Sequence, residues 1–242
     1  MRIRRIRTMT AIIKRELVAF FKNPIGWFVL AIYAFLSAIL FTLFVIWQNT
    51  SYLGDYFGFW LFFVDMVVVG ILSMRFFSEE KKNKTDQLLL TSPISLYQLV
   101  LGKFFGALII FLLCTSINLF YVLIIDIFGT VDYGCLATNL IGTVLALCAI
   151  ISIGLFVSAL TESSVAAAAG TMAILFFMFV VDFFAMFMPS WLANIIMHAN
   201  IYAQFDDFTN GILNLPPIVY YISVTVIFLF LAVRMIEKRR WS

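Results

Sequence analysis

Charged residues are scarce in this sequence. Asp, Glu, Lys and Arg make up 12% of the 242 residues, whereas hydrophobic residues make up 64%. Because a water-soluble domain carries about twice this fraction of charge, a soluble globular fold is excluded. No polar block is long enough to form a separate soluble domain. We therefore predict a single all-α integral membrane domain, residues 1–242, that is surrounded by membrane lipid and binds no nucleic acid.

Histidine and cysteine are also scarce. The sequence has one histidine, His198, which argues against a histidine-based metal site. Its three cysteines, Cys114, Cys135 and Cys148, lack the CxxC spacing of metal or redox sites. We expect them to act as small apolar packing residues and predict no metal site.

Motifs for ATP binding and for hydrolysis are absent from the sequence. A phosphate-binding loop needs GxxxxGK[ST], but Gly102 and Lys103 lack the upstream glycine and are followed by Phe104. There is no HExxH motif, no GxSxG motif and no pair of carboxylates beside a histidine. The chain is therefore predicted not to be an enzyme, with no catalytic residue and no cofactor of its own.

Long apolar runs, in contrast, are abundant. Six runs reach the length of about 20 residues that a membrane-spanning helix needs: residues 25–47, 57–77, 104–125, 135–160, 165–188 and 218–236. All 16 Lys and Arg residues lie before the first run, around the connection between the second and third, or at the end of the last. The opposite connections hold acids but no base: Asp55, Asp126, Asp132, Asp206 and Asp207. The positive-inside rule then predicts six transmembrane helices with cytoplasmic N and C termini.

The basic segment before the first run has helical periodicity of its own. Within residues 10–22, the apolar Ile13, Leu17, Phe20 and Phe21 follow helical spacing, and Lys14, Arg15 and Glu16 fall on the other face. This pattern predicts an N-terminal amphipathic helix in the cytoplasmic interface, which Asn23-Pro24 ends. Such a helix can be a topology anchor only, or it can also contact a cytoplasmic partner.

The outer segment between the fifth and sixth runs, residues 189–217, is too long for a turn and too apolar to be fully solvated. We predict two re-entrant half-helices that dip into the outer leaflet and are broken near Asn210-Gly211. Non-helical backbone at that depth must be buried in protein or line a wet cavity. A lid or gate is one interpretation, and a hairpin lying on the membrane surface is the other.

Three polar residues inside the apolar runs are candidates for a translocation path: Asp65, Asn118 and Asp182. Asp65 falls near mid-membrane, where an acid is costly and usually turns toward a partner or a cavity. Because every Lys and Arg is at the cytoplasmic end, we expect Asp65 either to be protonated or to be hydrogen-bonded to Asn118, Ser116 or Thr115. A contact with substrate or with a proton is the alternative.

Small residues mark faces on which helices can approach closely. Gly102 and Gly106 form a GxxxG pair at the start of the third run, and the fourth run has a face formed by Gly142, Ala146, Gly154 and Ser158. These spacings predict close helix packing, without naming the partner helix.

The most polar stretch is residues 78–95, SEEKKNKTDQLLLTSPIS. Thr85 can cap a short helix, Leu88 to Leu90 would give it an apolar side, and Pro93 would end it. Ser95 can then cap the helix that leads into the third run. From the residues alone, a solvated loop and a protein-binding helix are equally compatible with this stretch.

This stretch resembles the signature of ABC-2 type transporter permeases. In that signature a pair of acids and several basic residues precede a Gly-Thr pair and a short "ELLL" helix that a proline ends. Here Lys84 stands at the glycine position, and Asp86-Gln87 replaces the glutamate. The amphipathic first helix, the six runs and the long outer segment are similar to the same family. Within the family, the sequence looks most like the gliding-motility-associated permeases.

The resemblance implies a transmembrane permease subunit of an exporter in the bacterial cytoplasmic (inner) membrane. It also implies a second permease copy or a similar permease, and separate ABC ATPase subunits that bind ATP and Mg. An outer-facing accessory protein is a further expected partner. The resemblance assigns residues 78–95 as a cytoplasmic coupling helix, with these residues contacting the ATPase: Glu79, Glu80, Lys82, Thr85, Asp86, Leu88, Leu89, Leu90 and Pro93. The alternatives are a non-transporting scaffold or mechanotransmitter that anchors an ATPase, and an ATP-independent channel or carrier.

Overall fold

A computed structural model describes residues 2–50, 52–82, 95–185, 187–189, 197–198 and 200–240, and these residues form helices and connections without a strand. The main helices are α1 (Arg2–Lys22), α2 (Pro24–Phe41), α3 (Phe62–Ser73), α4 (Glu79–Lys82), α6 (Leu96–Ser116), α7 (Asn118–Phe128), α8 (Tyr133–Leu160), α9 (Ser164–Ala185), α11 (Asp206–Thr209) and α12 (Leu215–Arg240). Short helical segments extend or join them: η1 (Thr42–Ile46), η2 (Tyr56–Leu61), η3 (Met74–Ser78) and η4 (Ala203–Phe205).

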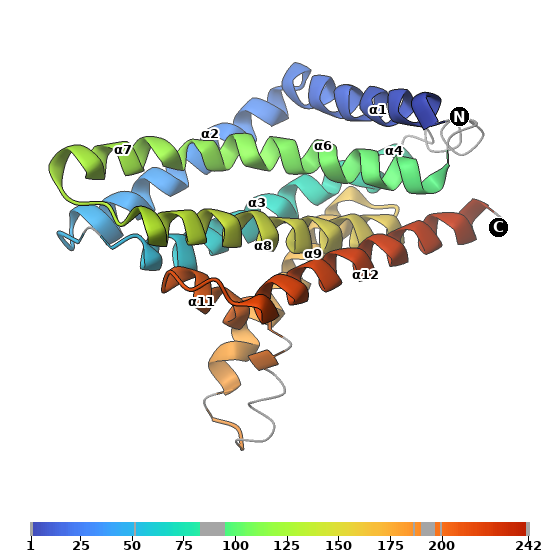
Figure 1. The fold of residues 1–242 in the computed structure, drawn as a ribbon. Coiled ribbons are helices and arrows are strands. Elements are labelled where there is room, and N and C mark those ends of the chain that lie inside the picture. Colours follow the sequence, from blue (N-terminus) through green and yellow to red (C-terminus); the bar gives the residue numbers. More distant parts are fainter. Residues whose placement is uncertain are drawn as a thin grey trace.

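Six helical stretches of the described chain are long and apolar enough to cross a membrane, which confirms the predicted number. They are Pro24–Ile46, Tyr56–Lys82, Leu96–Phe128, Tyr133–Leu160, Ser164–Val181 and Leu215–Lys238. The two terminal regions and α4 lie at the same end of the bundle (Figure 1). We call this the basic end, because the Lys and Arg residues gather there. The opposite end, which carries Asp55, Asp126 and Asp132, is the acidic end.

Helix α8 lies at the centre of the bundle and packs against α3, α6, α9 and α12. Its Leu147, Ile150 and Ile153 are fully buried. Gly154 allows the second span to approach closely, because a Cβ atom there would lie 3.4 Å from side-chain atoms of both Val69 and Phe76. The predicted small-residue face of this span is thus used for packing within the chain.

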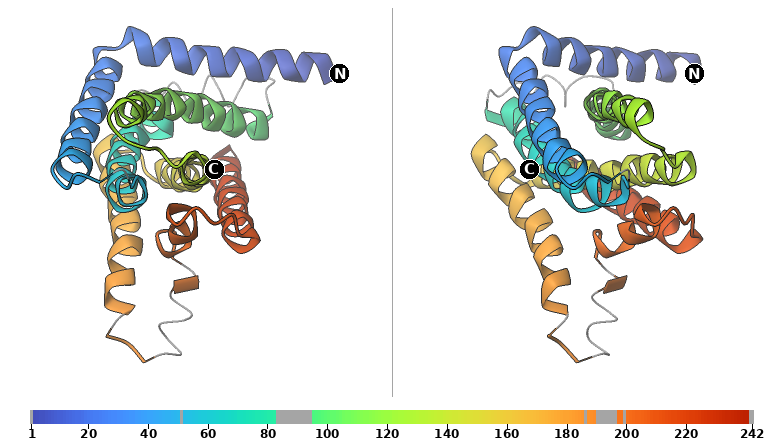
Figure 2. Two further views of the ribbon diagram at one scale, coloured as in Figure 1. Left: turned by 60° about the vertical axis from the view of Figure 1, so that its left-hand side comes forward. Right: turned by 90° about the vertical axis from the view of Figure 1, so that its left-hand side faces the viewer.

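Helix α1 packs lengthwise and parallel along the first half of α6, at the edge of the molecule away from α9 and α12 (Figures 1 and 2). The GxxxG pair forms the contact. A Cβ atom on Gly102 would lie 2.7 Å from Ile12 Cγ2, and one on Gly106 would lie 3.0 Å from Glu16 Cβ. The partner of the GxxxG face is therefore α1, and its contact line runs through Ile12, Glu16 and Phe20.

This contact differs from the predicted amphipathic helix in two respects. Helix α1 begins at Arg2 rather than near residue 10. Its buried face also differs in part: of the predicted apolar residues, Phe20 is buried and Ile13, Leu17 and Phe21 are half-buried, whereas Ile12, which was not on the predicted face, is buried as well. Its placement in a membrane interface stays a prediction.

The predicted break between α1 and α2 is confirmed. Asn23 has extended backbone geometry, with φ −90° and ψ 131°, and its side-chain oxygen accepts a hydrogen bond from the Ile25 N–H at 3.0 Å. Pro24 follows as the first residue of α2, where its missing N–H costs nothing. The predicted cap at Ser95 is confirmed as well, because Ser95 and Gln98 form a reciprocal capping box at the start of α6.

At the acidic end, the described part of the outer segment packs onto α8. Phe208 of α11 is fully buried, and its ring carbon Cγ would lie 2.7 Å from a Cβ atom on Gly142. The Thr138 hydroxyl donates to the Phe208 carbonyl at 3.1 Å. Gly211, with a φ of +78°, ends this helical piece at the predicted break. Residues 190–196, which were assigned to the first half-helix, lie outside the described residues, and re-entry into the membrane stays a prediction.

Candidate functional site

The predicted coupling segment begins at the basic end with α4. Glu79, Glu80 and Lys82 all belong to this helix, which directly continues the second span. The other predicted coupling residues, namely Thr85, Asp86, Leu88, Leu89, Leu90 and Pro93, lie outside the described residues. The structure therefore describes the first part of the segment, α4. Two sets of contacts attach α4 and the preceding end of the second span to the rest of the molecule.

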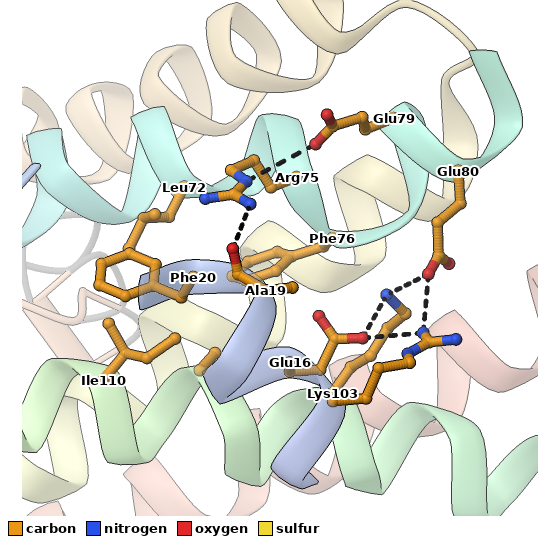
Figure 3. Close-up of a pocket in the computed structure, with 12 residues that line it drawn as sticks. Glu16, Ala19, Phe20, Leu72, Arg75, Phe76, Glu79, Glu80, Lys103 and Ile110 are labelled. Carbon is orange, nitrogen blue, oxygen red and sulfur yellow. Dashed lines mark hydrogen bonds and ion pairs between the residues drawn. The ribbon is translucent and has the colours of Figure 1, made fainter. Parts of the chain in front are cut away.

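The first set is an ion-pair ring formed by Arg15, Glu16, Glu80 and Lys103 (Figure 3). Glu16 Oε1 lies 2.9 Å from Arg15 Nη2 and 3.2 Å from Lys103 Nζ. Glu80 Oε1 lies 2.9 Å and 3.0 Å from the same two nitrogens. Two acids and two bases from α1, α4 and α6 thus alternate around the ring. Each carboxylate contacts both cations, which joins the three helices electrostatically.

Because the ring is partly buried, its charges interact more strongly than those of an ordinary surface ion pair. Only 2% of the Lys103 side chain is exposed, and its ammonium also lies 5.1 Å from the centre of the Phe77 ring. Burial alone would raise the pKa of Glu16, but Lys103 and Arg15 outweigh that effect and lower the pKa below its ordinary value. Glu16 is therefore held as a carboxylate by its two cations.

The second set of contacts joins the end of the second span to the C-terminal end of α8. Ser158 Oγ accepts hydrogen bonds from the backbone N–H groups of Phe77 at 2.9 Å and Ser78 at 3.1 Å. The buried Lys81 ammonium donates to the carbonyls of Ala159 and Thr161. A cation at a helix C-terminus satisfies carbonyls that have no partner within the helix and complements the helix dipole.

Acidification is expected to weaken the docking of α1. Because the pKa of Glu16 is lowered in the folded chain, its stabilising effect is present above the ordinary pKa of 4.5 and is lost as the pH falls below that value. Thermal unfolding in detergent from pH 7 to pH 4 should therefore show a falling midpoint, with a smaller slope in Glu16→Gln. Glu237→Gln, which breaks an exposed pair with Arg234 on α12, should keep the wild-type slope. Equal slopes in wild type and Glu16→Gln would contradict this assignment.

A second polar cluster lies inside the bundle, around Asp65. The Asn118 side chain accepts a hydrogen bond from the Tyr56 hydroxyl at 2.8 Å and donates one to the Tyr33 hydroxyl at 3.1 Å. Asp65 lies beside Tyr33, and its Oδ1 is buried without a hydrogen-bond partner among the described residues. The three partners expected for Asp65 bond elsewhere: the Asn118 amide binds tyrosines of the first and second spans, and the Thr115 and Ser116 hydroxyls donate to carbonyls of their own helix.

The third residue proposed for the translocation path, Asp182, lies in α9, and its side chain is outside what the structure describes. The other two, Asp65 and Asn118, belong to one buried cluster. The structure thus brings together two of the three residues, inside a single chain.

Sequence reasoning did not single out Arg15, Glu16, Lys81 and Lys103 as site residues. The charge census used the basic ones only to place them at the cytoplasmic end. One signal was available for Lys103, which lies between the small residues of the GxxxG face and therefore next to a closely packed helix. Lys81 lies inside the charged motif itself.

The six apolar helices and the anchored polar segment between the second and third spans define a multi-pass membrane protein. Residues 48–234, most of the chain, match the family model described as ABC-2 family transporter protein. The chain therefore belongs to the ABC-2 family, whose members are transmembrane permeases of ABC systems. They normally work with ABC ATPase subunits and are not themselves the ATPase. A search of the curated proteins gave no match. The matched region begins after α1, so Arg15 and Glu16 lie outside it.

Proposed function

We propose that this permease belongs to an exporter in which a separate ATPase moves residues 78–95, and that the ion-pair ring carries this movement into the membrane helices. The observation that supports this function best is the position of α4. Glu80 binds cations of α1 and α6, while its neighbour Lys81 binds the end of α8. A displacement of the segment would therefore act on three helices at once.

The remaining features of the proposal follow the family and the charge distribution. The basic end faces the cytoplasm of a bacterium, and the ATPase pair binds ATP and Mg beneath it. Two permease chains, identical or similar, form the path, with Asp65, Asn118 and Asp182 as its candidate polar residues. The outer segment, residues 189–217, acts as a lid, and an outer-facing accessory protein can join there. The similarity to gliding-motility permeases suggests this subfamily and stays a prediction.

Leu89→Asp is expected to abolish association with the ATPase while leaving membrane insertion intact, because a charge would be placed on the apolar side of the coupling helix. The measurement is the amount of ATPase subunit that co-purifies with the chain, together with ATP hydrolysis by the complex. The matched control is Leu213→Asp, the same change at an exposed leucine of the acidic end, which should leave both unchanged.

Undiminished co-purification of the ATPase with Leu89→Asp would show that residues 78–95 are not the docking element. The scaffold alternative has a different signature. An intact complex that hydrolyses ATP in sealed vesicles without moving any substrate would identify the chain as an anchor or force transmitter instead of an exporter.

A further inference from the structure

A cavity of about 280 Å³ lies between α1, the end of the second span and α6, beside the ion-pair ring (Figure 3). Its walls change in character along the bundle. Phe20, Leu72 and Ile110 are buried apolar residues at one side, whereas Arg75, Glu79 and the ring supply charges at the other. The cavity thus spans the boundary between the apolar and charged parts of the basic end, where a phospholipid headgroup meets its acyl chains.

Arg75 is the cation of this cavity with donors to spare. Its Nη2 makes a long hydrogen bond of 3.4 Å to the Ala19 carbonyl, and its Nε lies 3.6 Å from Glu79 Oε2. Its Nη1 is buried and has no hydrogen-bond partner among the described residues. A buried donor left unsatisfied is destabilising, so a ligand with an acceptor oxygen at this point would stabilise the site.

The charge balance selects the kind of ligand. Three bases and three acids line the cavity: Arg15, Arg75, Lys103, Glu16, Glu79 and Glu80. Because four of these six form the closed ring, the loosely paired Arg75 and Glu79 are left to bind a ligand. A purely anionic group would suit Arg75 but would be repelled by the neighbouring carboxylate. A zwitterion presents an anion and a cation together and matches both.

We propose that this cavity binds the headgroup of a zwitterionic phospholipid with a primary ammonium, of the phosphatidylethanolamine type. The phosphodiester accepts from Arg75 Nη1, the ammonium donates to Glu79, and the glycerol and upper acyl chains lie against Phe20, Leu72 and Ile110. A lipid bound there would contact three parts of the chain at once: α1, α6, and the end of the second span where α4 begins. The inference concerns binding alone and does not require that an ATPase moves this segment.

The test is native mass spectrometry of the delipidated full-length chain, with the subunits that co-purify, titrated with phosphatidylethanolamine, phosphatidylcholine or phosphatidylglycerol. We expect phosphatidylethanolamine to bind most tightly. Arg75→Gln should weaken its binding about tenfold or more, since a charge-assisted hydrogen bond is lost. Glu79→Gln should reduce the preference for phosphatidylethanolamine over phosphatidylcholine, whose trimethylated nitrogen cannot donate. The matched control is Arg234→Gln, which removes an exposed arginine paired with Glu237 at the same end of the bundle.

Three results would overturn the proposal. They are equal or tighter binding of phosphatidylglycerol, an equal loss of binding in Arg234→Gln, and competition by soluble glycerophosphoethanolamine at the same concentration as the lipid. The last result would identify a soluble phosphate compound as the ligand. Thermal unfolding of each variant separates loss of the site from loss of the fold, and the exposed position of Glu79 makes Glu79→Gln informative even if Arg75→Gln unfolds.

Discussion

Lys103→Met is expected to destabilise the chain by about 3–5 kcal/mol, the usual cost of removing one partner from a buried ion pair. Methionine is nearly as long as lysine and equally unbranched, so the packing against Phe77 is largely kept. What is lost is the ammonium that lies between two carboxylates at 3.2 Å and 3.0 Å. The ring would then keep Arg15 as its cation between Glu16 and Glu80, and the weakened attraction would loosen α4 from α1.

Equilibrium or thermal unfolding in detergent measures this loss, and Lys14→Met is the matched control because Lys14 is an exposed lysine of α1. The double variant Lys103→Met/Glu16→Gln should be less unstable than the sum of its single changes, since it removes one of the stranded carboxylates. A loss below about 1 kcal/mol in Lys103→Met, the range of exposed pairs, would show that the ring contributes no more than a surface ion pair.

Gly102→Val is expected to separate α1 from α6. The first added carbon alone would lie 2.7 Å from Ile12 Cγ2 and 3.0 Å from Ile12 Cβ, which is too close for either atom to stay in place. Overpacking of this kind costs about 1–3 kcal/mol, and here it would also pull Glu16 away from Lys103. We expect lower thermal stability and faster proteolysis within α1.

Ile12→Ala should rescue much of this effect, because it removes the side chain that the valine meets. Gly134→Ala in the first turn of α8 is the control, since its Cβ atom would meet only the Asp132 carboxylate, at 3.2 Å. If Gly102→Val and Ile12→Ala were simply additive, the close contact between α1 and α6 would not exist in the membrane.

The number of spans could be predicted from the sequence because it depends only on the length of apolar runs and the position of charges. The connection at Asn23-Pro24 and the cap at Ser95 were also predictable, since both depend on local backbone chemistry. The face that α1 buries was predicted only in part. Phe20 of the expected apolar face is buried, but the contact line also includes Glu16, which was expected on the polar face and is held by Arg15 and by Lys103 from a helix far along the chain.

The hydrogen-bond partners of the buried polar side chains could not be predicted from the sequence either. Asp65 was expected to bond to Asn118, Ser116 or Thr115, but the Asn118 amide bonds to Tyr33 of the first span and Tyr56 of the second. Lys81 was noted only as one of the basic residues of its motif, although it binds the carbonyl of Ala159 at the end of α8. In each case the contact partner depends on how the helices are rotated about their axes. The spacing of residues along the sequence does not determine that rotation.

Helix α8 is touched at both of its ends by segments that lie outside the apolar core. Near the acidic end, Phe208 packs on Gly142, and at the basic end, Lys81 and Ser78 hold Ser158 and Ala159. An α-helix of 28 residues is a stiff rod about 42 Å long. This one helix therefore contacts the segment that carries α4 at the basic end and α11 near the acidic end.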